Sequence, residues 1–199
     1  MRYVALLRGI NIGGNSKIEM KRLKALFKKL DYQDVIIYIN SGNVIFETNS
    51  KDYKKIEQDI EIGIAKEFSL NIRVVIRTKE NIKIVASKIE PTWQNNKDEK
   101  TSIMFLWAEV DSLNILKDIN QTKADEIIYV DGALIWHTTN KDFNKSGLSE
   151  LAENKLYKQM TVRNCNTVRK LAELMSKVYS RSAAVNNTPK ARHQITTES

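Results

Sequence analysis

The order of strand-type and helix-type patterns in the first 76 residues restricts the fold more than any other feature. Short runs of apolar and β-branched residues alternate with stretches whose apolar residues recur every three or four positions. The predicted strands are 3–7, 35–39, 44–47 and 72–76, and the predicted helices are 19–30 and 52–68. This β-α-β-β-α-β order is that of the ferredoxin-like split unit. Two helices would then cover one face of an antiparallel sheet, and something else must cover the other.

The second half repeats part of this order. Thr78 is a good N-cap for a short helix ending near Lys88, and Asp111 can cap another through Ile119. Asp131-Gly132 predicts a type I′ turn between two strands. The remaining predicted strands are 102–107, 127–130 and 133–137, and the remaining predicted helices are 148–157 and 167–179. We therefore expect an α+β fold: a ferredoxin-like plait with a second, similar α/β half.

These patterns divide the chain into three parts. We expect a first half over 1–77, a second half over 78–180 packed on it, and a disordered polar tail over 181–199. The alternative is one domain with a C-terminal elaboration.

Charge and cysteine usage limit the partners and the compartment. The formal net charge of +8 favours anionic ligands, although the lysines are interspersed with acidic residues as on an ordinary solvated surface. Cys165 is the only cysteine, which excludes an intramolecular disulfide or a cysteine-based zinc site and fits a cytoplasmic protein. No apolar run approaches the ~18 residues that span a membrane, so we expect no membrane association.

A polar loop rich in glycine and asparagine follows the first predicted strand. Glycines there let the backbone approach a ligand, and a following helix N-terminus favours anions. The loop matches neither G-x-x-x-x-G-K-[ST] nor G-x-G-x-x-G, and a structural turn stabilised by asparagine hydrogen bonds is equally compatible with it. Its candidate ligand-binding residues are Arg8, Asn11, Gly13, Gly14, Asn15 and Lys17.

Two further polar segments supply candidate residues. Ser41, Gly42 and Asn43 lie in a turn between two predicted strands, which on local rules alone is a hairpin turn. Arg163 and Asn164 precede the last predicted helix, where Asn164, or Asn166 or Thr167 after it, can serve as the N-cap. The alternative interpretation of this segment is a cap and a surface arginine.

No set of catalytic residues is evident. The two histidines lie in a predicted strand, His137, and in the tail, His193, so Cys/His or Ser/His/Asp chemistry is poorly supported. Cys165 is interpreted as a small buried residue rather than as a reactive thiol. No carboxylates have metal-ligand spacing. We therefore expect no metal and no cofactor, and a binding protein rather than an enzyme.

At the three polar segments the sequence resembles a bacterial family, domain of unknown function 1697. The resemblance rests on the segments 3–15, 38–46 and 161–168, together with Lys145-Ser146. The chain departs from the family pattern at Cys165, where an aromatic residue is expected. The resemblance implies a ferredoxin-like α+β plait and no established activity. It also implies that the candidate residues of the three segments form one site.

Three functions remain open. The first is binding of a small anionic or phosphorylated ligand by the three loops. The second is binding of RNA or single-stranded nucleic acid by a sheet face carrying Tyr38 and Phe46, which the absence of an RNP-type signature disfavours. The third is an enzyme acting on a phosphorylated small molecule. The oligomeric state cannot be predicted from the sequence.

Overall fold

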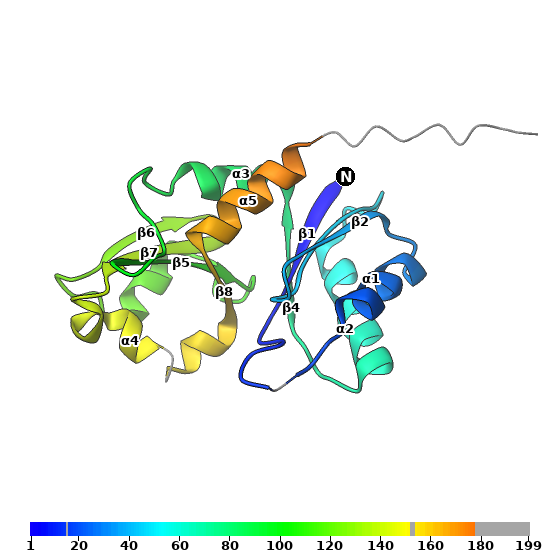
Figure 1. Ribbon diagram of the computed structural model, residues 1–199, viewed down its shortest axis with the longest axis horizontal. Helices are drawn as coiled ribbons and strands as arrows, with labels where there is room; N and C mark the ends of the chain where they lie inside the picture. The colour runs from blue at the N-terminus through cyan, green and yellow to red at the C-terminus, as the bar shows by residue number, and fades with distance from the viewer. Residues whose placement is uncertain (15, 152–153, 178–199) are drawn as a thin grey trace, which may run out of the picture.

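The computed structural model describes residues 1–14, 16–151 and 154–177 and contains two four-stranded antiparallel sheets with helices around them (Figure 1). The first sheet has the order β2-β3-β1-β4. Its strands are β1 (Arg2–Leu7), β2 (Gln33–Tyr38), β3 (Asn43–Glu47) and β4 (Val74–Thr78), and its helices are α1 (Met20–Lys29) and α2 (Tyr53–Phe68). Because all neighbours are antiparallel, β1 and β2 run parallel with β3 between them, as in a split β-α-β unit.

The second sheet has the order β6-β7-β5-β8, so its four strands take the same positions in chain order as those of the first sheet. The strands are β5 (Glu99–Leu106), β6 (Glu126–Val130), β7 (Ala133–Thr139) and β8 (Met160–Asn164). The helices are α3 (Lys79–Ser87), α4 (Gly147–Leu151) and α5 (Cys165–Ser176), with 3-10 segments η1 (Leu113–Asp118), η2 (Phe143–Lys145) and η3 (Lys155–Gln159). Within the described residues, no helix has the length and apolar character needed to cross a bilayer.

Strand β1 is apolar on both faces, and this pattern explains the layers. Tyr3 and Leu7 point into a core under α1 and α2, whereas Val4 and Leu6 point into a second core. That second core also contains Phe105 of β5 and residues of α3 and α5, so it joins the two sheets. Helix α5 runs across the junction of the two halves (Figure 1). The halves therefore share one hydrophobic layer.

The structure corrects the prediction for residues 160–164. No strand was predicted there, and Arg163 and Asn164 were placed in a polar segment before the last helix, but the segment forms β8, the edge strand that pairs with β5. The charged Arg163 interrupts the apolar pattern by which buried strands are recognised. Asn164 is the N-cap of α5, as expected, and accepts a hydrogen bond from Thr167 N at 2.8 Å.

Other boundaries in the second half also differ from the prediction. Asp111 does not cap a helix. Its carboxylate instead accepts hydrogen bonds from Gly132 N and the Tyr129 hydroxyl, and a 3-10 segment follows. The Asp131-Gly132 turn has positive φ only at Gly132, so it is not type I′. The predicted helix 148–157 is divided into α4 and η3, with 152–153 outside the described residues. The tail 181–199 also lies outside them.

Candidate functional site

The Arg163 side chain brings together segments from both halves of the chain. Its Nε donates to Asn43 Oδ1 at 2.6 Å, and its Nη2 donates to the carbonyl oxygens of Leu7 at 2.8 Å and Ser41 at 3.0 Å. Its Nη1 donates to Thr161 Oγ1 at 3.0 Å and to its neighbour's carbonyl at 2.7 Å. Ser41, Gly42, Asn43 and Arg163 therefore do meet, and we call these residues together with Leu7 the Arg163 cluster.

All three guanidinium nitrogens of the Arg163 cluster are used by protein acceptors. Only 7% of Arg163 is exposed, and burial lowers its pKa to about 10, so it remains charged at neutral pH. Asn43 is fully buried, and its amide also donates to Tyr38 O and Ser41 Oγ. The cluster is therefore satisfied internally, as buried polar groups must be. An anion could reach Arg163 only by displacing these bonds.

The candidate residues of the first loop that the structure describes make no hydrogen bond to that guanidinium. The side chain of Asn11 accepts from Ile18 N at 2.9 Å and donates to Asn40 O at 2.9 Å, so it joins the loop to the β2–β3 turn. Arg8 donates to Met160 O at 3.1 Å. Gly13 and Gly14 have positive φ and open space around them, Lys17 is exposed, and Asn15 lies outside the described residues.

The sheet face expected to bind nucleic acid is covered on both sides. Phe46 is fully buried under α1 and α2, where its ring packs on Tyr32 and Phe27. Tyr38 faces the opposite side and packs in the core shared by the two sheets. Phe46 is fully buried and half-buried Tyr38 lies on the opposite face, so the two rings do not form one stacking platform on an open sheet.

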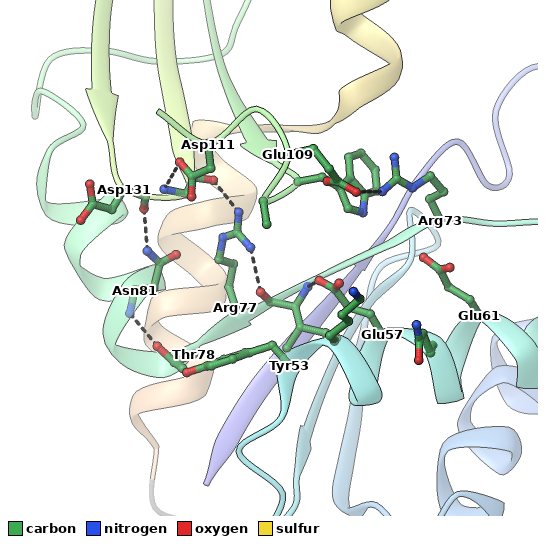
Figure 2. A pocket seen from close by; sticks show the side chains of 16 residues that line it. Tyr53, Glu57, Glu61, Arg73, Arg77, Thr78, Asn81, Glu109, Asp111 and Asp131 are labelled. Atoms are coloured by element: carbon green, nitrogen blue, oxygen red, sulfur yellow. Dashed lines mark hydrogen bonds and ion pairs between the residues drawn. The ribbon is translucent and has the colours of Figure 1, made fainter. Parts of the chain in front are cut away.

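A cleft lies between the two halves in the described part of the chain. Its volume is about 640 Å³. The first half contributes α2 and β4, and the second half contributes α3, the segment after β5 and the β6–β7 turn (Figure 2). The lining includes Tyr53, Lys54, Glu57, Glu61, Arg73, Ile76, Arg77, Asn81, Trp107, Ala108, Glu109, Asp111, Asp131 and Gly132.

The floor of the cleft is the free edge of β4, whose backbone groups are paired with side chains. Glu61 accepts from Val74 N at 2.8 Å, and Glu57 accepts from Ile76 N at 3.1 Å. Trp107 Nε1 donates to Val74 O at 3.0 Å. An edge strand normally exposes unpaired N–H and C=O groups to other strands. Here the cleft residues occupy these groups, so their side chains are held in place.

Arg73, which directly precedes β4, and Arg77 on β4 also make bonds to the second half, although Arg77 Nε is buried without a partner among the described residues. Arg77 donates to Gly132 O at 2.8 Å and to Leu106 O, which ties β4 to the second half. Arg73 pairs with Glu109 at 3.2 Å and lies over the Trp107 ring, 4.3 Å from its centroid. Burial lowers the pKa of Arg77, while the nearby Asp111 opposes that shift.

The carboxylates of the cleft are less completely neutralised. Burial is the largest effect on Glu57 and raises its pKa, although the bond from Ile76 N and the charge of Arg77 act in the opposite direction. Neighbouring Glu61 and Glu109 raise the pKa of Glu57 further. No group of three His, Cys, Asp or Glu residues in the described part of the chain could hold a metal ion.

The sequence analysis did not identify the cleft. One signal was available: Glu57 and Glu61 are spaced i, i+4 on one face of the predicted helix 52–68. Arg73 lies in the predicted strand 72–76 and Arg77 directly follows it, but an apolar pattern gives neither residue a role. Without knowing which edge α2 covers, these two pairs could not be placed opposite each other.

Two other buried polar groups serve the structure. Asp125 accepts from Trp136 Nε1 at 2.7 Å, from Gly147 N at 3.0 Å, and from the Ser146 hydroxyl. Burial would raise the pKa of Asp125, but these bonds outweigh burial and leave the pKa below its usual value. Cys165 is buried beside Trp93, and burial raises the pKa of its thiol. It is therefore a small core residue, as expected.

Comparison with known proteins identifies the family. A family model described as protein of unknown function (DUF1697) matches residues 1–136 of the 199. The chain belongs to the DUF1697 family. The matched range contains the first loop, the β2–β3 turn and every residue that lines the cleft, whereas Arg163 and Asn164 lie beyond it.

A solved structure shares the DUF1697 protein's fold. The conserved bacterial protein SP0830 from Streptococcus pneumoniae superposes with a TM-score of 0.75 at 20% sequence identity. The alignment covers 87% of this chain and 98% of that one. At this identity the likeness concerns the fold. No curated protein matches the sequence.

Proposed function

We propose that this DUF1697 protein is a small-ligand-binding module whose ligand lies in the cleft between its two halves. One observation carries the proposal: a cavity of about 640 Å³ is lined from both halves by aromatic, aliphatic and charged side chains. Binding sites for small molecules are concave, occur preferentially at domain junctions and typically measure about 300–1,000 Å³. Glu57, Glu61 and Trp107 are each fixed by a hydrogen bond to β4, which supports a binding site that is already formed before the ligand arrives.

A thermal-shift screen with a blocking variant tests this proposal. The screen covers nucleotides, sugar phosphates, amino acids and amines, because a ligand that binds only the folded state raises its melting temperature. Ala108 is exposed and lines the cleft, so Ala108→Trp places a bulky side chain at the cleft without changing its charge. Ala25, an exposed residue of α1, gives the matched control Ala25→Trp. Ligands of the cleft will lose their shift in Ala108→Trp and keep it in Ala25→Trp. If no shift depends on Ala108, the ligand does not bind there.

A second candidate is an anion site at the first loop. It is supported by Arg8 beside a loop in which Gly13 and Gly14 border open space and Lys17 is exposed. Backbone N–H groups in such a loop attract phosphate or carboxylate. Phosphate esters that bind there will lose their shift in Arg8→Ala and in Lys17→Ala but not in Ala108→Trp. Equal shifts in all three variants would remove this candidate.

We further propose that the protein consists of two ferredoxin-like halves and that it is located in the cytoplasm. The strand orders β2-β3-β1-β4 and β6-β7-β5-β8 support two ferredoxin-like halves related by duplication, with a boundary near residue 77. Superposition of the four strands of one sheet on the other tests this relation. The single cysteine supports a cytoplasmic location, which fractionation of cells can check.

A further inference from the structure

We propose that the cleft recognises a small organic cation, a primary amine or guanidinium, with its charged group between the carboxylates of α2 and the β6–β7 turn. This inference rests on the proposed function, because it names the class of ligand for the same cleft. It differs from the anionic ligand that the overall charge of the protein suggests.

The charge of the cleft is opposite to that of the molecule. Five carboxylates and three basic side chains line it, leaving a formal charge of −2 on a protein of +8. Two of the three basic side chains are already engaged, Arg73 with Glu109 and Arg77 with backbone carbonyls. The uncompensated charge in the cleft is therefore negative. A cleft lined by one sign of charge concentrates ligands of the other sign.

The acceptors that face the cleft are fixed but only partly used. Glu57 and Glu61 each use one oxygen for a backbone N–H of β4, and the other oxygen of each has no hydrogen-bond partner within the described residues. The helix spacing places these two carboxylates one turn apart on the same face of α2, above the β4 edge (Figure 2). A cation with several N–H donors can bond both free oxygens.

A buried acceptor on the opposite wall also lacks a donor. Asn81 donates through Nδ2 to Asp131 O at 2.8 Å, which fixes the orientation of its amide. Its Oδ1 is buried and has no hydrogen-bond partner among the described residues. Figure 2 shows Asn81 on the cleft side of α3, facing Arg77. A buried unpaired acceptor is costly, and Arg77 Nε is a buried donor that likewise has no partner among the described residues. A ligand N–H group could bond Asn81 Oδ1 once a shift of the Asn81 side chain uncovers it.

The spread of the acceptors favours an organic cation over a metal ion. No three carboxylates in the described part of the chain converge closely enough to hold a metal. The acceptors instead follow both walls of a cavity of about 640 Å³, which suits an extended molecule. Burial raises the pKa of Glu57, so a cation that binds the ionised form will bind more tightly as pH rises from acid to neutral.

Matched probes and variants test the inference. Arginine is compared with citrulline and putrescine with 1,4-butanediol, by calorimetric titration of the full chain, because each pair differs in charge and little in shape. Glu57→Gln keeps a side-chain oxygen for Ile76 N while removing the charge. Glu67→Gln is the control, because Glu67 lies on the same helix but pairs with Arg22 outside the cleft. Glu61→Gln serves if Glu57→Gln does not fold.

The expected result is that the charged member of at least one pair binds about tenfold or more tightly than its neutral partner. Glu57→Gln should weaken that binding by about tenfold, as expected for a partly buried charge pair, and Ala108→Trp should abolish it. Glu67→Gln should leave it unchanged. If only neutral or anionic compounds bind, and Ala108→Trp abolishes their binding, the inference fails and the proposed function stands. If no compound in either screen depends on Ala108, both fail.

Discussion

Replacing Arg163 with methionine tests whether the Arg163 cluster is a structural joint. The substitution keeps the apolar length of the side chain and removes every donor. It removes the Arg163 donor from six acceptors: Asn43 Oδ1, Thr161 Oγ1 and the carbonyl oxygens of Leu7, Ser41, Gly42 and Val162. Each unsatisfied buried acceptor costs roughly 1–3 kcal/mol. Removal of the buried charge recovers several kcal/mol of desolvation, so the expected loss of unfolding free energy is about 3–5 kcal/mol.

Urea denaturation followed by circular dichroism measures this loss. With a slope of about 2 kcal/mol/M, a loss of about 4 kcal/mol lowers the midpoint by about 2 M. Arg163→Lys keeps the charge but cannot reach all the acceptors, so its loss should lie between those of wild type and Arg163→Met. The control is Arg169→Met on α5, because Arg169 makes a single hydrogen bond, to Glu90 O at 3.0 Å. The structural interpretation is refuted if Arg163→Met destabilises no more than Arg169→Met, which should cost less than about 1 kcal/mol.

The remaining predictions concern single sites. Gly42→Ala should cost about 2–4 kcal/mol in urea denaturation, because φ is +75° and the new Cβ would meet Leu7 Cβ at 2.7 Å. Gly13→Ala, at φ +58° in open space, should cost only about 1–2 kcal/mol, and equal losses would contradict the steric argument. Asp125→Asn should cost about 2–3 kcal/mol at pH 7, because the new amide faces Gly147 N instead of accepting from it. The pKa of Asp125 is lowered on folding, so its stabilisation is full above its ordinary value of about 3.9 and is lost as pH falls below that. The stability difference between wild type and Asp125→Asn should therefore shrink in acid, and a constant difference would exclude an ionised Asp125.

The local signals that identified secondary structure correctly were those with a single physical cause. The apolar spacing of 52–68 and the N-cap at Thr78 depend on neighbouring residues only, and α2 and α3 form where they predicted. The antiparallel α+β class followed from the order of such elements. Strand β8 could not be found this way, because Arg163 is buried by groups far away in the chain.

The candidate sites show the same limit. Proximity of Ser41, Gly42, Asn43 and Arg163 was expected from the resemblance, and the residues do meet. The hydrogen-bond partners of the Arg163 guanidinium could not be predicted from the sequence, because a guanidinium before a helix can bind an anion or a set of backbone carbonyls equally well. The cleft was not predicted, because it forms where α2 and β4 pack near the segment after β5, and this packing cannot be inferred from local sequence patterns.

The bond between Arg163 and Leu7 has a consequence for synthesis on the ribosome. The two residues are 156 positions apart, so β1 is made long before β8. Until α3, β5 and α5 have emerged, the face of the first sheet that carries Val4, Leu6 and Ile45 lacks the elements that complete its core. The nascent chain should therefore expose a hydrophobic surface during most of its translation. Chaperones bind intermediates that expose such surfaces. Ribosome-bound chains ending near residue 100 should crosslink to such chaperones more strongly than chains long enough to expose β8 and α5 outside the exit tunnel.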